Sequence, residues 1–133
     1  MLIMAVDLGK ARTGIAACDN GFLAYPVTVI SEKRKEVLLQ KVADEVKKAD
    51  LIVVGLPKNM DGSEGESAQN ARAFADSLTE KTGVKTIMVD ERSTTVMAHG
   101  FLNDTNTRGK KRKAVVDSVA AVVILQSYID SIK

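Results

Sequence analysis

Acidic residues occupy three places in this sequence where the surrounding residues are apolar. Asp7 interrupts an apolar run that ends at Gly9, the pair Asp90–Glu91 closes a second apolar run, and Asp117 lies within a long apolar stretch. Removing a carboxylate from water is costly unless the group is hydrogen-bonded, ion-paired or bound to a cation. Each of these positions therefore needs a compensating partner.

Carboxylates that meet in a folded chain repel one another unless a cation relieves the charge. Oxygen ligands of this kind favour hard divalent cations, so Mg²⁺ or Mn²⁺ is the expected metal. Two such ions about 4 Å apart can activate a water molecule and stabilise an in-line displacement at phosphorus. Asp7, one acid of the Asp90–Glu91 pair and Asp117 thus predict phosphodiester hydrolysis. Structural roles stay open, with Asp7 bonded to amides of its own turn and Asp117 paired with Arg12 or Arg92.

Basic and amide side chains accompany these acids and are candidates for binding nucleic acid. They follow predicted strand ends or precede the segment that carries Asp117, which would place them along one edge. They are Arg12, Lys58, Asn59, Arg92, Lys110, Lys111, Arg112 and Lys113. Such a rim suits contacts with a phosphate backbone. For the run Lys110–Lys113, a solvated loop without a ligand is the simpler alternative.

The first part of the chain is expected to form an antiparallel meander of three strands. Leu2–Gly9, Ile15–Cys18 and Tyr25–Ile30 are apolar or β-branched runs separated by turns that contain glycine. Pro26 suits an edge strand, because proline cannot donate a hydrogen bond to a neighbouring strand. The third strand is therefore expected at the edge of a sheet.

The rest of the chain alternates helical and strand patterns. Two capped helix starts are expected, one at Ser31 and one at Ser63, where Glu66 completes a capping box. The expected elements are a helix from Ser31 to about Asp50, a strand Leu51–Leu56, a helix from Ser63 to Gly83, a strand Val84–Val89, a short helix from Ser93 to about Leu102, and a buried, largely apolar helix Ala114–Ile132.

Together these elements predict an α/β fold. Right-handed crossover connections favour a five-stranded mixed sheet of order 3-2-1-4-5 with helices on both faces. The first strand is then central, and the parallel fourth and fifth strands end at the same edge of the sheet. This arrangement places Asp7 in the middle of that edge and brings the other acids towards it.

The composition fits a single domain spanning residues 1–133. Its 19 Lys and Arg residues against 17 acidic residues leave a net charge of +2, so electrostatic recognition must come from local clusters. The one cysteine, Cys18, lies in an apolar strand pattern and predicts a buried thiol in a reducing compartment. No apolar run reaches the length of a membrane helix and no signal peptide is evident, so a cytoplasmic protein without membrane contact is expected.

Four ordered motifs resemble the YqgF family, also called RuvX. They are Asp7–Ala16 (DLGKARTGIA), Val54–Ser63 (VGLPKNMDGS), Asp90–Thr95 (DERSTT), and Asp117–Ala121 (DSVAA) followed by Ile124–Gln126. The resemblance covers essentially the whole chain. It implies a ribonuclease H-like fold and a bacterial, cytoplasmic, metal-dependent nuclease assigned to 5′-end processing of pre-16S rRNA in ribosome biogenesis. The older assignment of the family is Holliday junction resolvase.

The resemblance also implies roles for individual residues. They are Asp7, Glu91 and Asp117 as catalytic and metal-binding acids, and Arg12 and Arg92 as the arginines beside them. Neighbours in an extended segment point to opposite sides, so Asp90 stays an alternative to Glu91 until the register is known. The first loop carries Lys10–Ala11 where a Thr-Lys-type pair is usual, a departure that touches none of the acids.

The expected partner is nucleic acid, with pre-16S rRNA favoured over branched DNA. Ribosomal precursor particles as partners, and a monomer or a homodimer, are left open. Two other classes of function also stay open. One is a non-catalytic RNA-binding module. The other is a phosphotransferase, because Asp-x-Gly-x-x-x-x-Gly after a first strand also resembles the phosphate loop of actin-like and sugar-kinase ATPases, which close two such domains around a nucleotide.

Overall fold

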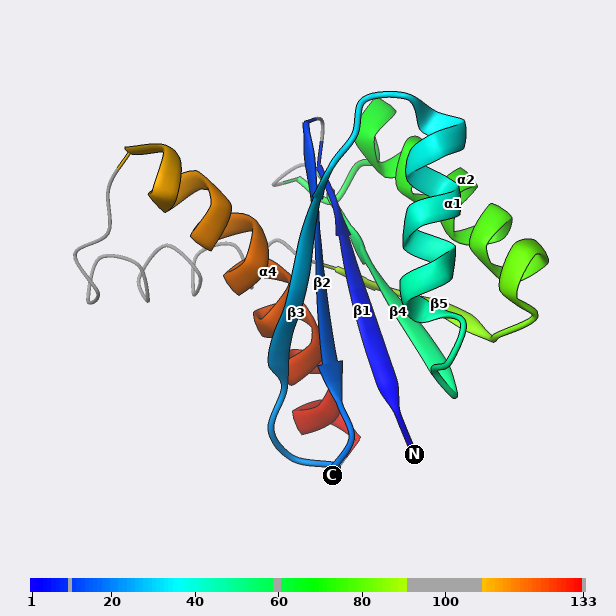
Figure 1. Ribbon diagram of the computed structural model, residues 1–133, viewed down its shortest axis with the longest axis vertical. Helices are drawn as coiled ribbons and strands as arrows, with labels where there is room; N and C mark the ends of the chain where they lie inside the picture. The colour runs from blue at the N-terminus through cyan, green and yellow to red at the C-terminus, as the bar shows by residue number, and fades with distance from the viewer. Residues whose placement is uncertain (10, 59–60, 91–108, 133) are drawn as a thin grey trace.

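The computed structural model describes residues 1–9, 11–58, 61–90 and 109–132, with the backbone alone for residues 109–118. Five strands form one sheet in the order β3-β2-β1-β4-β5 (Figure 1). They are β1 (Ile3–Leu8), β2 (Arg12–Cys18), β3 (Tyr25–Ser31), β4 (Leu51–Leu56) and β5 (Thr86–Asp90). The first three strands pair antiparallel, whereas β4 pairs parallel with both β1 and β5. The predicted strand order and the central place of the first strand are confirmed.

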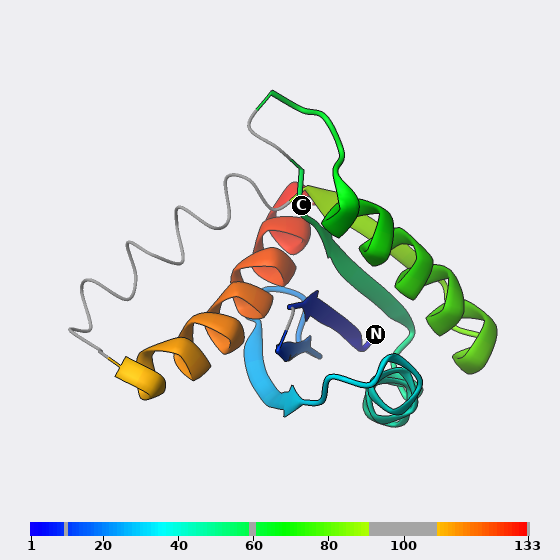
Figure 2. The ribbon, with the colours of Figure 1, turned by 90° about the horizontal axis from the view of Figure 1, so that it is seen from above.

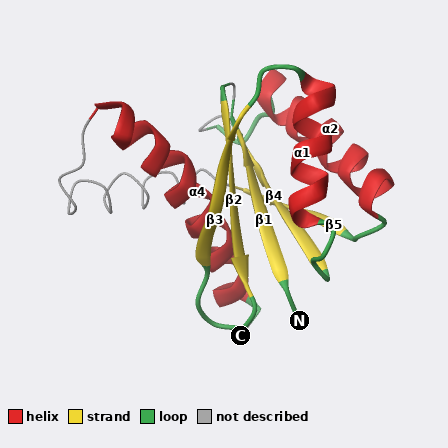
Figure 3. Cartoon of the chain, viewed as in Figure 1, coloured by secondary structure: helices red, strands yellow, loops and turns green. Residues whose placement is uncertain are grey.

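Helices cover both faces of the sheet, as predicted (Figures 2 and 3). Helices α1 (Lys35–Val46) and α2 (Glu66–Thr82) pack on one face, and α4 (Gly109–Ser131) packs on the other. Because side chains alternate along a strand, β1 divides its residues between these two cores. Met4 and Val6 belong to the core under α1 and α2, while Ile3 and Ala5 belong to the core under α4. We call the side of the sheet that α1 and α2 cover the α1/α2 face, and the side that α4 covers the α4 face.

Helix α2 buries one stripe of apolar residues and ends where predicted. Its buried residues are Ala68, Ala71, Ala75 and Leu78, and small residues at this spacing let the helix lie close to its neighbours. Gly83 follows the helix with a φ of 71°, the left-handed conformation that glycine adopts without steric cost. The local sequence therefore determines where α2 stops.

Both predicted helix caps are wrong. Ser31 is the last residue of β3, and α1 begins after Arg34 without a side-chain cap. Helix α2 begins after Gly65, also without a side-chain cap. Asp61 Oδ1 instead accepts hydrogen bonds from the Ser63 backbone N–H at 2.9 Å and from the Ser63 hydroxyl at 2.6 Å. Short polar side chains bond to nearby loop groups as readily as to a helix start, so a local turn replaces the predicted capping box.

Helix α4 begins five residues earlier than predicted, at Gly109 instead of Ala114. The backbone of the basic run Lys110–Lys113 is therefore helical, which corrects the expectation of a loop; Lys and Arg are good helix formers. The expectation that α4 is buried on nearly all sides is also wrong for residues 119–132. Only Ala121, Ile124, Leu125 and Ile129 are buried there, because the helix packs against the sheet along one side.

The C-terminal half of α4 is tied to the connection between β2 and β3. The Gln126 side-chain oxygen accepts a hydrogen bond from the Ala24 backbone N–H at 2.9 Å, and its amide nitrogen donates to the Phe22 carbonyl at 2.8 Å. Nearby, Cys18 is a buried free thiol, as predicted. Among the described helices, none is long and apolar enough to cross a membrane.

Candidate functional site

Asp7 lies near the carboxyl end of the central strand. It is the second-last residue of β1, is half-buried, and pairs with Gly14 of β2. Ile3 and Ala5, which precede it at two-residue steps, both pack into the core under α4. The alternation of side chains therefore places Asp7 on the α4 face.

Glycines stand beside Asp7 on both neighbouring strands. Gly14 is its direct partner on β2. On the other side Val6 pairs with Val54, so the next residue of the parallel strand, Gly55, comes level with Asp7. Neither position carries a side chain, which leaves the carboxylate flanked by backbone alone at these two points. Glycine within a strand often marks a place where a ligand or another backbone approaches closely.

The turn from β1 to β2 brings Arg12 back beside Asp7. A side chain at Gly9 would overlap the backbone carbonyl of Arg12, so this close approach requires glycine. Arg12 is the first residue of β2 and is half-buried. Ala16 and Cys18, at even spacing from Arg12, pack into the core under α4. Arg12 and Asp7 therefore occupy one face at the same end of the sheet.

Asp90 does not share the face of Asp7. It is the last residue of β5 and pairs with Leu56 of β4, a residue of the core under α1 and α2. Met88, two residues earlier, packs against the same core. The register thus assigns Asp90 to the α1/α2 face. The neighbouring Glu91 lies outside the described residues, as do Arg92 and Asn59.

Lys58 lies just after β4, at the end of the sheet where β1 also ends, and is half-buried. Before α2, the two carboxylate oxygens of Glu64 accept hydrogen bonds from Arg72 at 2.7 and 2.8 Å. This contact with Arg72 lowers the pKa of Glu64, and the charge of Lys58 adds to the effect. Lys58 thus lies close to Glu64 and at the same end of the sheet as Asp7.

The remaining predicted site residues are on α4. Asp117 and the run Lys110–Lys113 belong to its backbone, and their side chains lie outside the described part of the structure. Position 117 is one helical turn before the buried Ala121, on the helix that covers the face of Asp7. Among the residues whose side chains are described, no three His, Cys, Asp or Glu residues gather as a metal site. The three-acid site stays a prediction, because Asp7 alone of its members has a described side chain.

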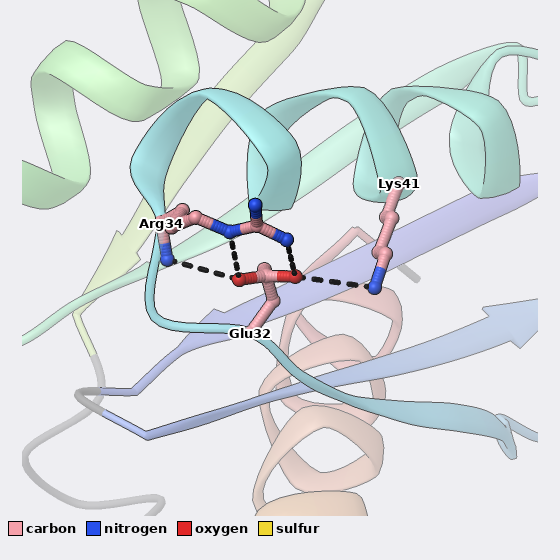
Figure 4. Close-up of polar contacts among 3 residues, drawn as sticks. All are labelled: Glu32, Arg34 and Lys41. Carbon is pink, nitrogen blue, oxygen red and sulfur yellow. Dashed lines mark hydrogen bonds and ion pairs between the residues drawn. The ribbon is translucent and has the colours of Figure 1, made fainter.

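One charged cluster at this end of the sheet was not anticipated from the sequence. Glu32, in the connection from β3 to α1, accepts hydrogen bonds from the backbone N–H of Arg34 at 3.1 Å and from its Nε at 3.2 Å (Figure 4). Lys41 Nζ approaches the other carboxylate oxygen at 3.3 Å. The hydrogen bonds from Arg34, followed by the weaker contact with Lys41, lower the pKa of Glu32 to about 2. The sequence signal that could have predicted this cluster is a Glu-x-Arg sequence directly after a strand.

A family model described as "RuvX: Holliday junction resolvase" matches residues 1–131 of the chain. The chain belongs to the RuvX family. This is a family of nucleases and resolvases, consistent with a hydrolase that acts on phosphodiester bonds, and the predicted recognition is confirmed. A relative from Nitrosospira multiformis, named "Putative pre-16S rRNA nuclease", is 40% identical over 131 residues, which cover 96% of this chain and 86% of the relative.

Solved structures agree with the fold of a RuvX member. RuvC of Thermus thermophilus, in complex with a Holliday junction substrate, matches with a TM-score of 0.61 at 12% identity, covering 98% of this chain and 96% of RuvC. A ROK hexokinase from the same organism matches with a TM-score of 0.51 at 18% identity, covering 74% of this chain and 38% of the hexokinase. At these identities the likeness concerns the fold alone. The predicted ribonuclease H-like fold is confirmed.

Proposed function

We propose that this protein is a metal-dependent nuclease that processes the 5′ end of pre-16S rRNA in the cytoplasm. The observation that carries the proposal is the position of Asp7. Its half-buried carboxylate lies at the carboxyl end of the central parallel strand, between two glycines, with Arg12 on the same face. In open α/β sheets, ligands bind beyond the carboxyl ends of the strands. The name of the relative from Nitrosospira multiformis supports RNA as the substrate.

Glu91 is proposed as the second acid and Asp117 as the third. The register puts Asp90 on the face opposite to Asp7, and the next residue of an extended segment points to the other side. This alternation favours Glu91 over Asp90. For Asp117, the support is its position one turn before Ala121 on the helix that packs over the face of Asp7.

The donor set fits a hard divalent cation. Carboxylate oxygens from Asp7, Glu91 and Asp117, completed by water, match the coordination that Mg²⁺ or Mn²⁺ prefers. When bound, such ions supply an activated water and charge stabilisation at the phosphorus. Asp7 suits this role because it is half-buried and has no neighbouring side chain at positions 14 and 55.

The cations at the same edge are proposed to hold the nucleic acid. Arg12 shares the face of Asp7, and its planar guanidinium can contact two phosphate oxygens at once. Lys58 borders the same end of the sheet. Further phosphate contacts are proposed for Asn59, Arg92, Lys110, Lys111, Arg112 and Lys113. These groups position the backbone so that the scissile phosphate lies beside Asp7.

The decisive experiment compares the wild-type protein with Asp7→Asn. Wild type should cleave a pre-16S rRNA fragment when Mg²⁺ or Mn²⁺ is present, and Asp7→Asn should lose cleavage while it still binds the RNA. Asp19→Asn is the matched control, because Asp19 is exposed and lies at the opposite end of β2. Undiminished cleavage by Asp7→Asn would refute the metal site at this position. Binding without cleavage by wild type would instead indicate an RNA-binding module.

Branched DNA is the alternative substrate, favoured by the description of the family model. A four-way DNA junction should therefore be incubated beside the RNA fragment under the same conditions, and the mass of the protein should be measured in solution. Resolution of a junction needs two symmetric cuts and hence a dimer, whereas trimming of an RNA end needs one cut. Cleavage of the RNA alone by a monomer is the expected result.

A further inference from the structure

A cavity of about 340 Å³ opens between α1 and α2 at the carboxyl end of β1. Both helices begin at this end of the sheet and run side by side away from it (Figures 1 and 2). Leu8 and Gly9 contribute the strand side of the cavity. Its volume lies within the range of sites that bind small ligands.

The walls of the cavity combine apolar side chains with hydrogen-bonding groups. Leu38 and Leu39 line it from α1, and Phe74 lines it from α2. Ser67, Asn70 and Ser77 also line it from α2. A nucleobase has apolar faces and a polar edge, and stacking of a base on an aromatic ring does not depend on which base it is. The lining therefore matches the chemistry of a base.

The rim of the cavity carries charges of both signs. Lys33 and Lys35 line it together with Glu32 and Glu36. The charge of Glu32, whose side chain is only 12% exposed, is already compensated by Arg34 and Lys41 (Figure 4). Two lysines and two glutamates thus line the cavity, and Glu32 is paired with residues outside the lining. Lys33 and Lys35 suit contacts with the phosphates on either side of a bound base.

The cavity and Asp7 lie on two sides of one strand end. Leu8 packs towards the α1/α2 face and lines the cavity, whereas Asp7, its neighbour, lies on the α4 face. Gly9 follows directly and lines the same cavity. A single strand that crosses the end of β1 can place one phosphate beside Asp7 and a nearby base in the cavity.

We propose that this cavity holds one unpaired base of the strand that is cut. The inference rests on the proposed nuclease function and narrows its substrate class to strands with an unpaired base near the scissile phosphate. A four-way junction with all bases paired has no such base to offer. The cavity therefore favours the single-stranded end of an RNA over a fully paired junction.

The test measures binding of a short, fluorescently labelled single-stranded oligoribonucleotide and of the same sequence as a blunt duplex. All proteins carry Asp7→Asn so that cleavage cannot intervene. Phe74→Ala removes the stacking surface, and Ala73→Leu fills the cavity from an exposed position of α2 without removing a core side chain. Phe22→Ala is the matched control, because Phe22 is 62% exposed and lies in the loop between β2 and β3, at the other end of the sheet.

Phe74→Ala and Ala73→Leu should each weaken binding of the single strand about tenfold and leave duplex binding within about twofold, while Phe22→Ala changes neither. If Ala73→Leu bound the single strand as tightly as the protein with Asp7→Asn alone, the proposal would be overturned. The cavity would then be assigned to binding of a protein partner. Equal losses for single strand and duplex would also overturn it. Failure of the nuclease function is seen separately, as absence of metal-dependent cleavage by wild type.

Discussion

Asp7 and Gly14 face each other across the β1–β2 pair, so the proposed catalytic carboxylate has no side chain opposite it. On the other neighbouring strand, β4, Gly55 comes level with Asp7 and also carries no side chain. Glycine weakens a strand interior, and it is retained where another group must approach the backbone closely. The two glycines therefore fit the proposed approach of a ligand to Asp7.

Gly14→Val should lower cleavage by about a hundredfold or more. The new side chain would stand on the α4 face beside Asp7 and occupy the space through which metal and phosphate approach. Because Gly14 is buried, far-UV circular dichroism and a melting curve must accompany the assay, so that a loss of folding is distinguished from a loss of cleavage. A folded Gly14→Val protein with wild-type cleavage would show that the space beside Asp7 is not used.

Glu91→Gln should abolish cleavage, whereas Asp90→Asn should retain at least about a tenth of it. The prediction follows from the register, because Asp90 shares the face of Leu56 and lies away from Asp7. Initial cleavage rates at saturating Mg²⁺ give the comparison. If the order of the two effects were reversed, the proposal of Glu91 as the second acid would be wrong.

Replacing Lys110, Lys111, Arg112 and Lys113 together by Ala should weaken RNA binding and reduce its salt dependence. Each lost phosphate contact should lower the slope of log affinity against log salt by roughly one unit. Alanine also keeps α4 helical, so the substitution tests charge rather than backbone structure. The control replaces Lys47 and Lys48, exposed residues at the end of α1 farthest from Asp7. If the slope were unchanged in both the quadruple variant and the control, the basic run would not contact phosphates and would be a solvated start of α4.

Glu32 should titrate far below an ordinary glutamate. Its pKa falls from 4.5 to about 2 because Arg34, and to a lesser extent Lys41, stabilise the charged form. A lowered pKa in the folded state means that this contribution to stability is present above about pH 4.5. It is then lost as the pH falls towards about 2.

Carboxyl chemical shifts measured by NMR across this interval give the pKa of Glu32 directly. Arg34→Gln removes the larger cause and should raise it towards 4.5, whereas Lys41→Gln should raise it less. The accompanying loss of stability should be small, because the side chain of Arg34 is 76% exposed and water screens the pair. An unchanged Glu32 titration in Arg34→Gln would refute the assigned cause.

Local sequence patterns were sufficient to predict the strand order of the sheet and the family of the chain. Apolar runs of strand length, the turn glycines and the handedness of crossover connections together determine the order β3-β2-β1-β4-β5. Asp7 stood out because a carboxylate is rare in such a run. Helix starts were predicted less well, since Ser63 has both the next helix and Asp61 within reach, and composition does not decide between two local hydrogen-bond partners.

The faces of the sheet depend on tertiary structure. Asp90 and Glu91 are neighbours with similar chemistry. The pairing of β5 with β4 places Asp90 on the α1/α2 face, whereas Asp7 lies on the α4 face. The cavity beside Phe74 likewise exists only because α1 and α2 pack side by side at the end of β1. Composition and spacing determined which groups this chain can offer to nucleic acid. Register and helix packing decided which of them share a face, because those relations join residues far apart in the sequence.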